Sequence, residues 1–170
     1  MRRAGAATLL VALLLLAQVA AAGSSHAAEP NQHFFVLGQV ENPKATLFGV
    51  GPVSGLGTLT AQGVTFDEPS KSYDETDVIA VDAGTLTVAI HGSFSTWPFA
   101  LAPPFCTQHG TMSGTWTITS GTRAFAGATG NGTFSGGFFT FGPRTPAGCD
   151  TTSVKGVVAG PMRGTVTLHR

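Results

Sequence analysis

Short segments in which apolar residues alternate with threonine recur along this chain, and they limit its fold more than any other feature. Three examples are residues 84–90 (GTLTVAI), 114–119 (GTWTIT) and 164–168 (GTVTL). A period of two places the apolar side chains on one face of a β-strand and the polar ones on the other. No stretch after residue 30 has a clear helical period. The sequence therefore predicts an all-β protein built from half-buried antiparallel strands.

The alternating segments are numerous enough to form a closed sheet. The candidate strands are residues 33–40, 45–50, 55–65, 77–81, 84–91, 112–119, 130–141, 153–159 and 163–169. Most prolines fall between these segments, as strand interiors require. Within one domain over residues 23–170, this number of strands predicts a single antiparallel β-barrel of about eight strands, with a β-sandwich as the alternative.

The charge content excludes two classes of protein. Nine Lys and Arg balance nine Asp and Glu, only 11% of the residues are charged, and 42% are apolar. Disordered chains have the opposite composition, rich in charge and poor in apolar residues. Proteins that bind nucleic acid carry an excess of Lys and Arg that neutralises phosphates. We therefore expect a folded protein with no nucleic-acid partner.

The N-terminus has the pattern of a secretory signal peptide. Arg2 and Arg3 supply positive charge, residues 9–19 are apolar apart from Gln18, and residues 20–22 are alanines of the kind that signal peptidases accept. We expect a signal peptide over residues 1–22 and a secreted, extracellular protein with no membrane contact after cleavage. An uncleaved anchor is the alternative, because the apolar run is about long enough to span a bilayer.

The chain has two cysteines, Cys106 and Cys149. An oxidising compartment predicts a disulfide between them, and a pair of free thiols is the alternative. Both lie in segments rich in Pro or Gly, which are typical of loops. The bridge should therefore connect two loops at one end of a barrel, whereas a sandwich would place the cysteines on facing strands.

Residues 114–136 (GTWTITSGTRAFAGATGNGTFSG) and 74–88 (DETDVIAVDAGTLTV) are similar to segments of one known group. They resemble small secreted bacterial members of the allene oxide cyclase-like, or dirigent-like, superfamily. Arg123 departs from the pattern, which usually has glycine there, so we expect a different turn. The resemblance implies an eight-stranded antiparallel barrel. Plant members include a cyclase and proteins that steer radical coupling, both acting on apolar small molecules, but we carry none of their catalytic residues over to this chain.

Sequence motifs of known chemistry are missing from this chain. It has no nucleophile elbow, no phosphate-binding lysine motif and no His-Glu-x-x-His, and its histidines are scattered. We therefore expect no metal site and no cofactor. Residues 67–82 contain six acidic residues and one lysine. We interpret them as a solvated connection between strands, with a calcium loop as the alternative.

One segment, residues 94–105, concentrates large apolar side chains between prolines. It is interpreted as a stiff loop that plugs or flanks the barrel, or as a lid over an apolar pocket. The candidate ligand-binding residues are Phe94, Trp97, Phe99 and Phe105.

The sequence does not determine which face of the first predicted strand points into the barrel. His33, Gln39 and Glu41 share a phase with Phe35 and Leu37, and this phase would put polar groups into the lumen if it pointed inward. The opposite phase, Phe34, Val36 and Gly38, is equally apolar.

These observations favour a secreted, non-enzymatic barrel that binds an apolar small molecule at its mouth. Two alternatives stay open: an extracellular structural or interaction protein, and an isomerase or cyclase that acts in the lumen. A buried titratable pair inside the barrel would favour the enzyme. A lumen filled with side chains would favour the structural protein.

The signal peptide leads to a prediction about processing. Export should remove residues 1–22, so that the mature chain begins near Gly23. N-terminal sequencing of protein recovered from the culture medium checks this. Recovery of the full-length chain from membranes alone would contradict it.

Overall fold

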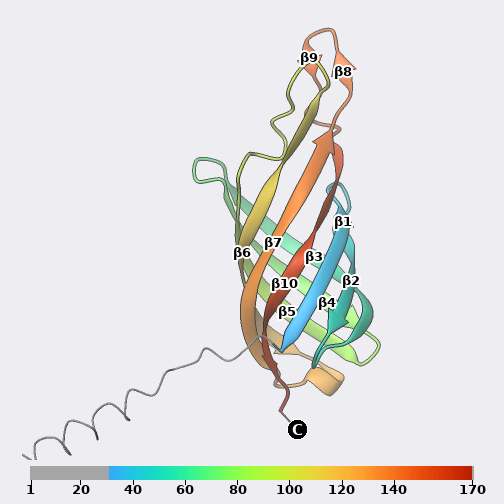
Figure 1. Cartoon of the computed structure of the whole chain (residues 1–170), viewed down its shortest axis with the longest axis vertical. Helices are drawn as coiled ribbons and strands as arrows, with labels where there is room; N and C mark the ends of the chain where they lie inside the picture. Colours follow the sequence, from blue (N-terminus) through green and yellow to red (C-terminus); the bar gives the residue numbers. More distant parts are fainter. Residues whose placement is uncertain (1–30, 170) are drawn as a thin grey trace, which may run out of the picture.

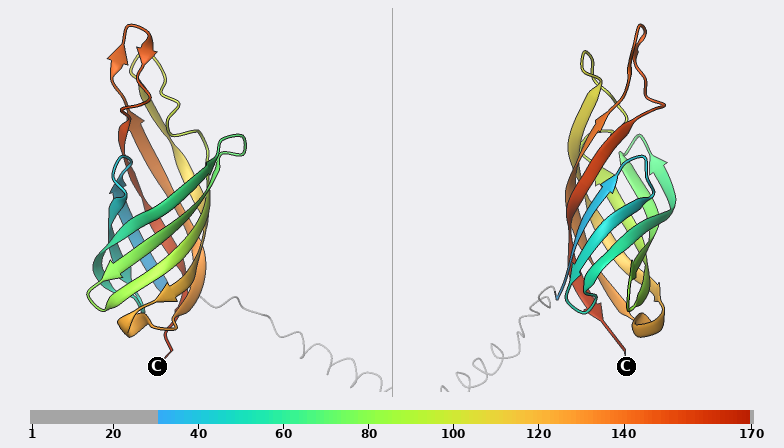
Figure 2. Two further views of the ribbon diagram at one scale, coloured as in Figure 1. Left: turned by 180° about the vertical axis from the view of Figure 1, so that it is seen from behind. Right: turned by 90° about the vertical axis from the view of Figure 1, so that its right-hand side faces the viewer.

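Ten β-strands make up most of residues 31–169, which are the residues that the computed structural model describes (Figure 1). Their bounds are β1 (Gln32–Gln39), β2 (Lys44–Val50), β3 (Gly55–Asp67), β4 (Ser72–Val81), β5 (Gly84–Phe94), β6 (Thr107–Gly121), β7 (Thr129–Phe141), β8 (Arg144–Thr145), β9 (Gly148–Cys149) and β10 (Lys155–Thr167). The closed barrel has the order β1-β10-β7-β6-β5-β4-β3-β2, and β8 and β9 form a separate hairpin (Figure 2). The predicted fold class is confirmed, and the sandwich alternative is wrong. The predicted signal peptide lies outside the described residues.

Closure of the barrel depends on the pairing of its first and last strands. Consecutive barrel strands pair with each other along the chain, and the β1–β10 ladder runs from Gln32↔Gly164 to Gln39↔Val157. A closed antiparallel sheet has no free edge on which another chain could add a strand. Antiparallel neighbours need no crossover, so most connections are short; the exceptions are residues 95–106 between β5 and β6 and residues 142–154 between β7 and β10.

Two of the predicted strands are a single strand. The segments predicted at 153–159 and 163–169 are joined in β10, which continues through Pro161. Proline cannot donate a ladder hydrogen bond, so a strand tolerates it only where pairing is interrupted. The β10–β7 ladder is interrupted there, since pairing passes from Ala159↔Gly137 to Met162↔Phe134.

The acidic segment 67–82 is not a solvated connection, as its sequence had suggested. Residues 68–71 form one turn and Asp82 begins the next, and between them β4 occupies Ser72–Val81. Along β4, Tyr73, Asp77 and Ile79 are buried at alternate positions. The prediction was wrong because carboxylates usually lie at the surface, whereas the period of two on this strand places some of them inside.

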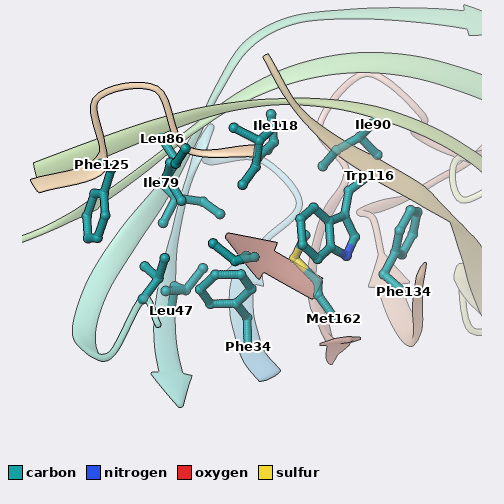
Figure 3. Packing of buried hydrophobic residues seen from close by; sticks show 14 of the residues in the cluster. Phe34, Leu47, Ile79, Leu86, Ile90, Trp116, Ile118, Phe125, Phe134 and Met162 are labelled. Atoms are coloured by element: carbon teal, nitrogen blue, oxygen red, sulfur yellow. The ribbon is translucent and has the colours of Figure 1, made fainter. Parts of the chain in front are cut away.

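Side chains fill one half of the lumen (Figure 3). Trp116 is buried at its centre and meets Phe34 edge-on, with ring centroids 6.2 Å apart. A Cβ atom on Gly132 or Gly164 would lie 2.7 or 2.6 Å from the indole ring. Glycine at these strand positions therefore makes room for a large aromatic side chain inside a narrow barrel.

A short 3₁₀ helix, η1 (Arg123–Phe125), closes the filled end, and its Phe125 is buried. Arg123 has a φ angle of 54°. This left-handed conformation is the one that glycine adopts most readily. The turn at the position where the resembled pattern has glycine therefore keeps a glycine-like backbone.

The inward face of β1 is the one that carries Phe34. Phe34 is 2% exposed, whereas Phe35 and Leu37 are each 52% exposed. The phase shared by His33, Phe35 and Leu37 therefore points outward, and the polar interior considered for it is wrong for most of β1. Packing in the core determines this orientation, because Phe34 contacts the buried Trp116.

Cys106 and Cys149 form the predicted disulfide, with their Sγ atoms 2.09 Å apart. The bridge connects the segment that precedes β6 to β9 at the end of the barrel where the β8–β9 hairpin projects (Figure 1). The bridge lies at one end of the barrel and outside the barrel strands, which agrees with the expectation for a barrel, although Cys149 belongs to the short strand β9 rather than to a loop. Such a bridge is compatible with an extracellular protein.

The disulfide should contribute measurably to stability, because it closes a loop whose ends are 43 residues apart in the sequence. We expect Cys106→Ser combined with Cys149→Ser to lower the free energy of unfolding by about 2–5 kcal/mol. Urea denaturation of the oxidised protein and the double variant measures this difference. Equal midpoints at an equal slope would contradict the prediction.

Candidate functional site

The other half of the lumen is open and contains a cavity of about 490 Å³. Most of its wall is apolar. Six of the lining residues, each from a different strand, are Val36, Leu59, Ile90, Met112, Phe134 and Met162. The mouth is bounded by the β1–β2 turn, residues 40–43, and by Pro98 and Phe99 of the β5–β6 connection. The filled half of the barrel forms the floor, since Ile90 of the wall pairs with the core residue Trp116.

The structure brings together three of the four ligand-binding residues predicted from the sequence. Phe94 and Phe99 line the cavity. Trp97 packs behind them, with its ring centroid 5.9 Å from Phe94, 6.0 Å from Phe99 and 5.3 Å from Phe66. We refer to Phe66, Phe94, Trp97 and Phe99 as the aromatic cluster. Phe105 lies outside it and is 81% exposed.

Phe66 is a member of this cluster that the sequence prediction missed. It lies at the end of β3, which extends to Asp67 rather than stopping at residue 65. Its ring is close to every other member of the cluster, with centroid distances of 5.3–6.5 Å. The signal was present in the sequence, because Val64 and Phe66 continue an alternating pattern.

Two carboxyl groups, those of Glu75 and Asp77, lie on the wall of the cavity. They are two residues apart on β4, so they share its inward face. Asp77 is 1% exposed. Of the side chains that line the cavity, none is a Lys, Arg or His. The two carboxyl groups, which we call the carboxyl pair, therefore have no cationic partner in the lumen.

Burial changes the proton affinity of the carboxyl pair. Burial, together with the negative charge of Asp77 and a hydrogen bond to it, raises the pKa of Glu75 to about 8. Burial also raises the pKa of Asp77 to about 6, and the hydrogen bond with Glu75 opposes this rise. A neutral Glu75 that donates to an ionised Asp77 explains both directions. Near neutral pH the pair therefore holds one proton and one negative charge.

Burial also affects the Tyr73 hydroxyl and leaves two polar atoms, one on Asp77 and one on Trp116, without a hydrogen-bond partner. Burial, followed by the charges of Glu75 and Asp77, raises the pKa of the Tyr73 hydroxyl, so it stays protonated. Oδ1 of Asp77 is buried and receives no hydrogen bond from an N–H or hydroxyl group of the described residues. The indole Nε1 of Trp116 is likewise buried and without a partner within residues 31–169.

The carboxyl pair could have been found from the sequence, although it was not. Glu75 and Asp77 alternate in phase with Tyr73 and Ile79, which is the pattern of one strand face. The opposite phase points outward: Asp74 is exposed, and its Oδ1 lies 2.7 Å from Nδ1 of His91 on β5. Acidic residues occur on both faces of this strand, so the overall composition of the segment gave no sign that one face is buried.

The described part of the chain gathers no three His, Cys, Asp or Glu side chains that could hold a metal ion. The calcium loop considered for residues 67–82 therefore finds no support in the structure, because calcium takes six to eight oxygen ligands. Two carboxyl groups with a shared proton are instead suited to hydrogen bonding and to proton transfer.

A second apolar surface lies on the outside of the barrel. Phe35, Phe48 and Leu56 are neighbours in register across β1, β2 and β3. They are 52%, 52% and 70% exposed. Exposed apolar stripes of this kind are typical of contact surfaces.

Comparison of the chain with protein-family models, with curated proteins and with solved structures finds no match. The function of the cavity is therefore argued from its own geometry and chemistry. The resemblance to the allene oxide cyclase-like superfamily stays a prediction.

The carboxyl pair should make stability depend on pH. In the unfolded chain both carboxyls have ordinary, lower pKa values, so between about pH 4 and 8 the folded state binds more protons than the unfolded state. The free energy of unfolding should therefore fall as pH rises across this window, by several kcal/mol, since each unit of pKa shift corresponds to about 1.4 kcal/mol. Glu75→Gln combined with Asp77→Asn should remove most of this slope.

Urea denaturation at pH 5 and pH 8 measures the effect. Glu68→Gln is the control, because Glu68 is exposed in the β3–β4 turn and its removal should leave the slope in place. A slope of the same size in the double variant would show that the pair does not titrate as described.

Proposed function

We propose that this barrel binds a small, predominantly apolar molecule in the open half of its lumen. The observation that carries the proposal is the mostly apolar cavity of about 490 Å³, whose mouth is bounded on one side by Pro98 and Phe99. Ligand pockets are commonly 300–1,000 Å³ in volume and mostly apolar, with a few polar groups that orient the ligand. An eight-stranded barrel is just wide enough to hold one small ligand.

The mouth supports this proposal because the β5–β6 connection, residues 95–106, which we call the aromatic loop, is fixed to the barrel. Thr140 on β7 is fully buried, and its hydroxyl donates a hydrogen bond of 2.7 Å to the carbonyl oxygen of Pro98. The backbone N–H of Ser95 donates to the carbonyl oxygen of Thr111 on β6. A loop that is ordered before binding loses little entropy when a ligand enters.

We also propose that the protein is secreted and belongs to the allene oxide cyclase-like superfamily. The signal-like N-terminus and the disulfide support secretion. The similarity over residues 74–88 and 114–136 supports the family. Within residues 31–169 there is no helix of the length and apolar character that a membrane span needs.

A second candidate function is an isomerase or cyclase that acts in the lumen. The carboxyl pair favours it, because a protonated Glu75 beside an ionised Asp77 offers an acid and a base in one apolar site. Such an enzyme would exchange a proton with a bound substrate. Solvent deuterium entering the α-carbon of a bound cyclic ketone, detected by NMR and lost in Glu75→Gln, would support it.

The structural or interaction alternative is favoured by a different surface, the exposed outer stripe of Phe35, Phe48 and Leu56. A lumen filled along its whole length would also have favoured it. Because half of the lumen is open, binding in the cavity is the better-supported proposal.

Two neighbouring residues of β1 test the proposal. Val36 faces the cavity and Leu37 faces outward, so Val36→Phe should fill the lumen while Leu37→Phe changes only the outer surface. We expect Val36→Phe to weaken binding of the neutral dye N-phenyl-1-naphthylamine about tenfold or more, about 1.4 kcal/mol of binding free energy. Leu37→Phe should bind the dye as the unmodified protein does. Fluorescence titration measures both affinities.

A second pair of variants examines the mouth. Trp97→Ala should weaken dye binding because it removes the side chain that supports Phe94 and Phe99, whereas Phe105→Ala should have no effect. Circular dichroism confirms that each variant folds. Unchanged binding in both Val36→Phe and Trp97→Ala would place the dye elsewhere and overturn the proposal.

A further inference from the structure

We infer that the molecule bound in the lumen carries a positive charge: it is a small apolar amine whose ammonium group pairs with Glu75 and Asp77. This inference rests on the proposed function, because it names the chemical class of the ligand for the same cavity. It adds what the apolar wall alone does not specify, namely the sign of the ligand's charge and the point at which that charge lies.

The carboxyl pair is surrounded by apolar neighbours in the sheet. In the strand register Glu75 is opposite Val64 on β3 and Ile90 on β5. Asp77 is opposite Ala61 on β3 and Val88 on β5. None of these side chains can donate a hydrogen bond or supply a positive charge. The protein itself therefore leaves the negative charge of the pair without a counterion.

The charges around the rest of the cavity have the same sign. Its titratable lining groups are Tyr73, Glu75 and Asp77 on β4 and Glu41 in the β1–β2 turn. The lining residues of β1, β2, β3, β5, β6, β7 and β10, and of the aromatic loop, include no titratable side chain. Glu41 accepts a hydrogen bond of 3.2 Å from the backbone N–H of Gly156, which fixes it at the rim. Low-dielectric walls with charge of one sign attract the opposite charge.

The carboxylate of Asp77 has few donors around it. Asp77 is 1% exposed and lines the cavity, and its Oδ1 receives no hydrogen bond from an N–H or hydroxyl group of the described residues. The proton of Glu75 is the donor that this carboxylate receives. A buried charged acceptor with few donors is costly, so a ligand that supplies a donor gains affinity. An ammonium group offers three N–H donors together with a positive charge.

Other ligand head groups fit the site less well. A hydroxyl group can donate one hydrogen bond but leaves the charge uncompensated. A carboxylate would add a negative charge beside the pair and would be repelled. The expected order of affinity for one apolar body is therefore ammonium, then hydroxyl, then carboxylate.

Protonation gives the inference a pH dependence. Burial raises the pKa of both carboxyls, to about 8 for Glu75 and about 6 for Asp77, so the pair becomes neutral as the pH falls below about 6. An alkyl ammonium group keeps its charge throughout this range, as the lysine side chain does. The preference for an amine should therefore be large near pH 8 and should decline as the pH falls to 5.

Three probes with one ring system test the inference: 1-naphthylmethylamine, 1-naphthylmethanol and 1-naphthoate. Isothermal titration at pH 8 should give an affinity for the amine at least about tenfold higher than for the alcohol, and the weakest binding for the carboxylate. At pH 5 the ratio of amine to alcohol should fall below about threefold. Glu75→Gln combined with Asp77→Asn should abolish the preference at pH 8.

Asp74→Asn is the matched control, since Asp74 is on the same strand but faces outward, and it should keep the preference. Equal binding of amine and alcohol to the unmodified protein would overturn the inference while leaving the proposed function in place. A preference that survives in the double variant would overturn it as well. If the naphthyl probes and the neutral dye all fail to bind, the proposed function itself is wrong. Should the double variant not fold, the comparison of pH 8 with pH 5 on the unmodified protein decides the question.

Discussion

The pairing of β1 with β10 is the interaction on which the rest of the structure depends. It joins the two ends of an antiparallel meander and satisfies the ladder hydrogen bonds that both edge strands would otherwise expose to water. Closure also creates an interior, because each strand then has one face toward the lumen and one toward solvent. The cavity, the buried core and the carboxyl pair are all consequences of that division.

The lumen is divided by the sizes of the side chains that enter it. In one half, Trp116 occupies the space that Gly132 and Gly164 leave free, and the interior is packed. In the other half the side chains of the wall leave a cavity of about 490 Å³ open between them. Glu75 pairs with Ile90, which in turn pairs with Trp116, so the sheet register connects the carboxyl pair to the packed half.

The carboxyl pair is unfavourable for folding, since the half-buried Glu75 and the buried Asp77, without a cation, lose solvation that the strand neighbours do not replace. Residues of this kind are typically retained where a site needs them, at the expense of stability. The disulfide between Cys106 and Cys149 acts in the opposite direction by restricting the unfolded chain. The groups that provide the binding chemistry thus lower the stability of this small barrel, and the disulfide raises it.

The all-β class, a barrel as the favoured architecture, the disulfide and most of the aromatic segment around Phe94 and Phe99 could be predicted from the sequence alone. Alternation, proline placement and cysteine number are local properties, and each can be read along the chain. The sequence left open which phase of β1 faces inward, and it did not reveal that Glu75 and Asp77 face the lumen. Both phases of β1 are apolar, and acidic residues are normally solvated. Which face of each strand points into the lumen is set only when the barrel closes, because burial of a side chain depends on the strands that lie across the lumen from it.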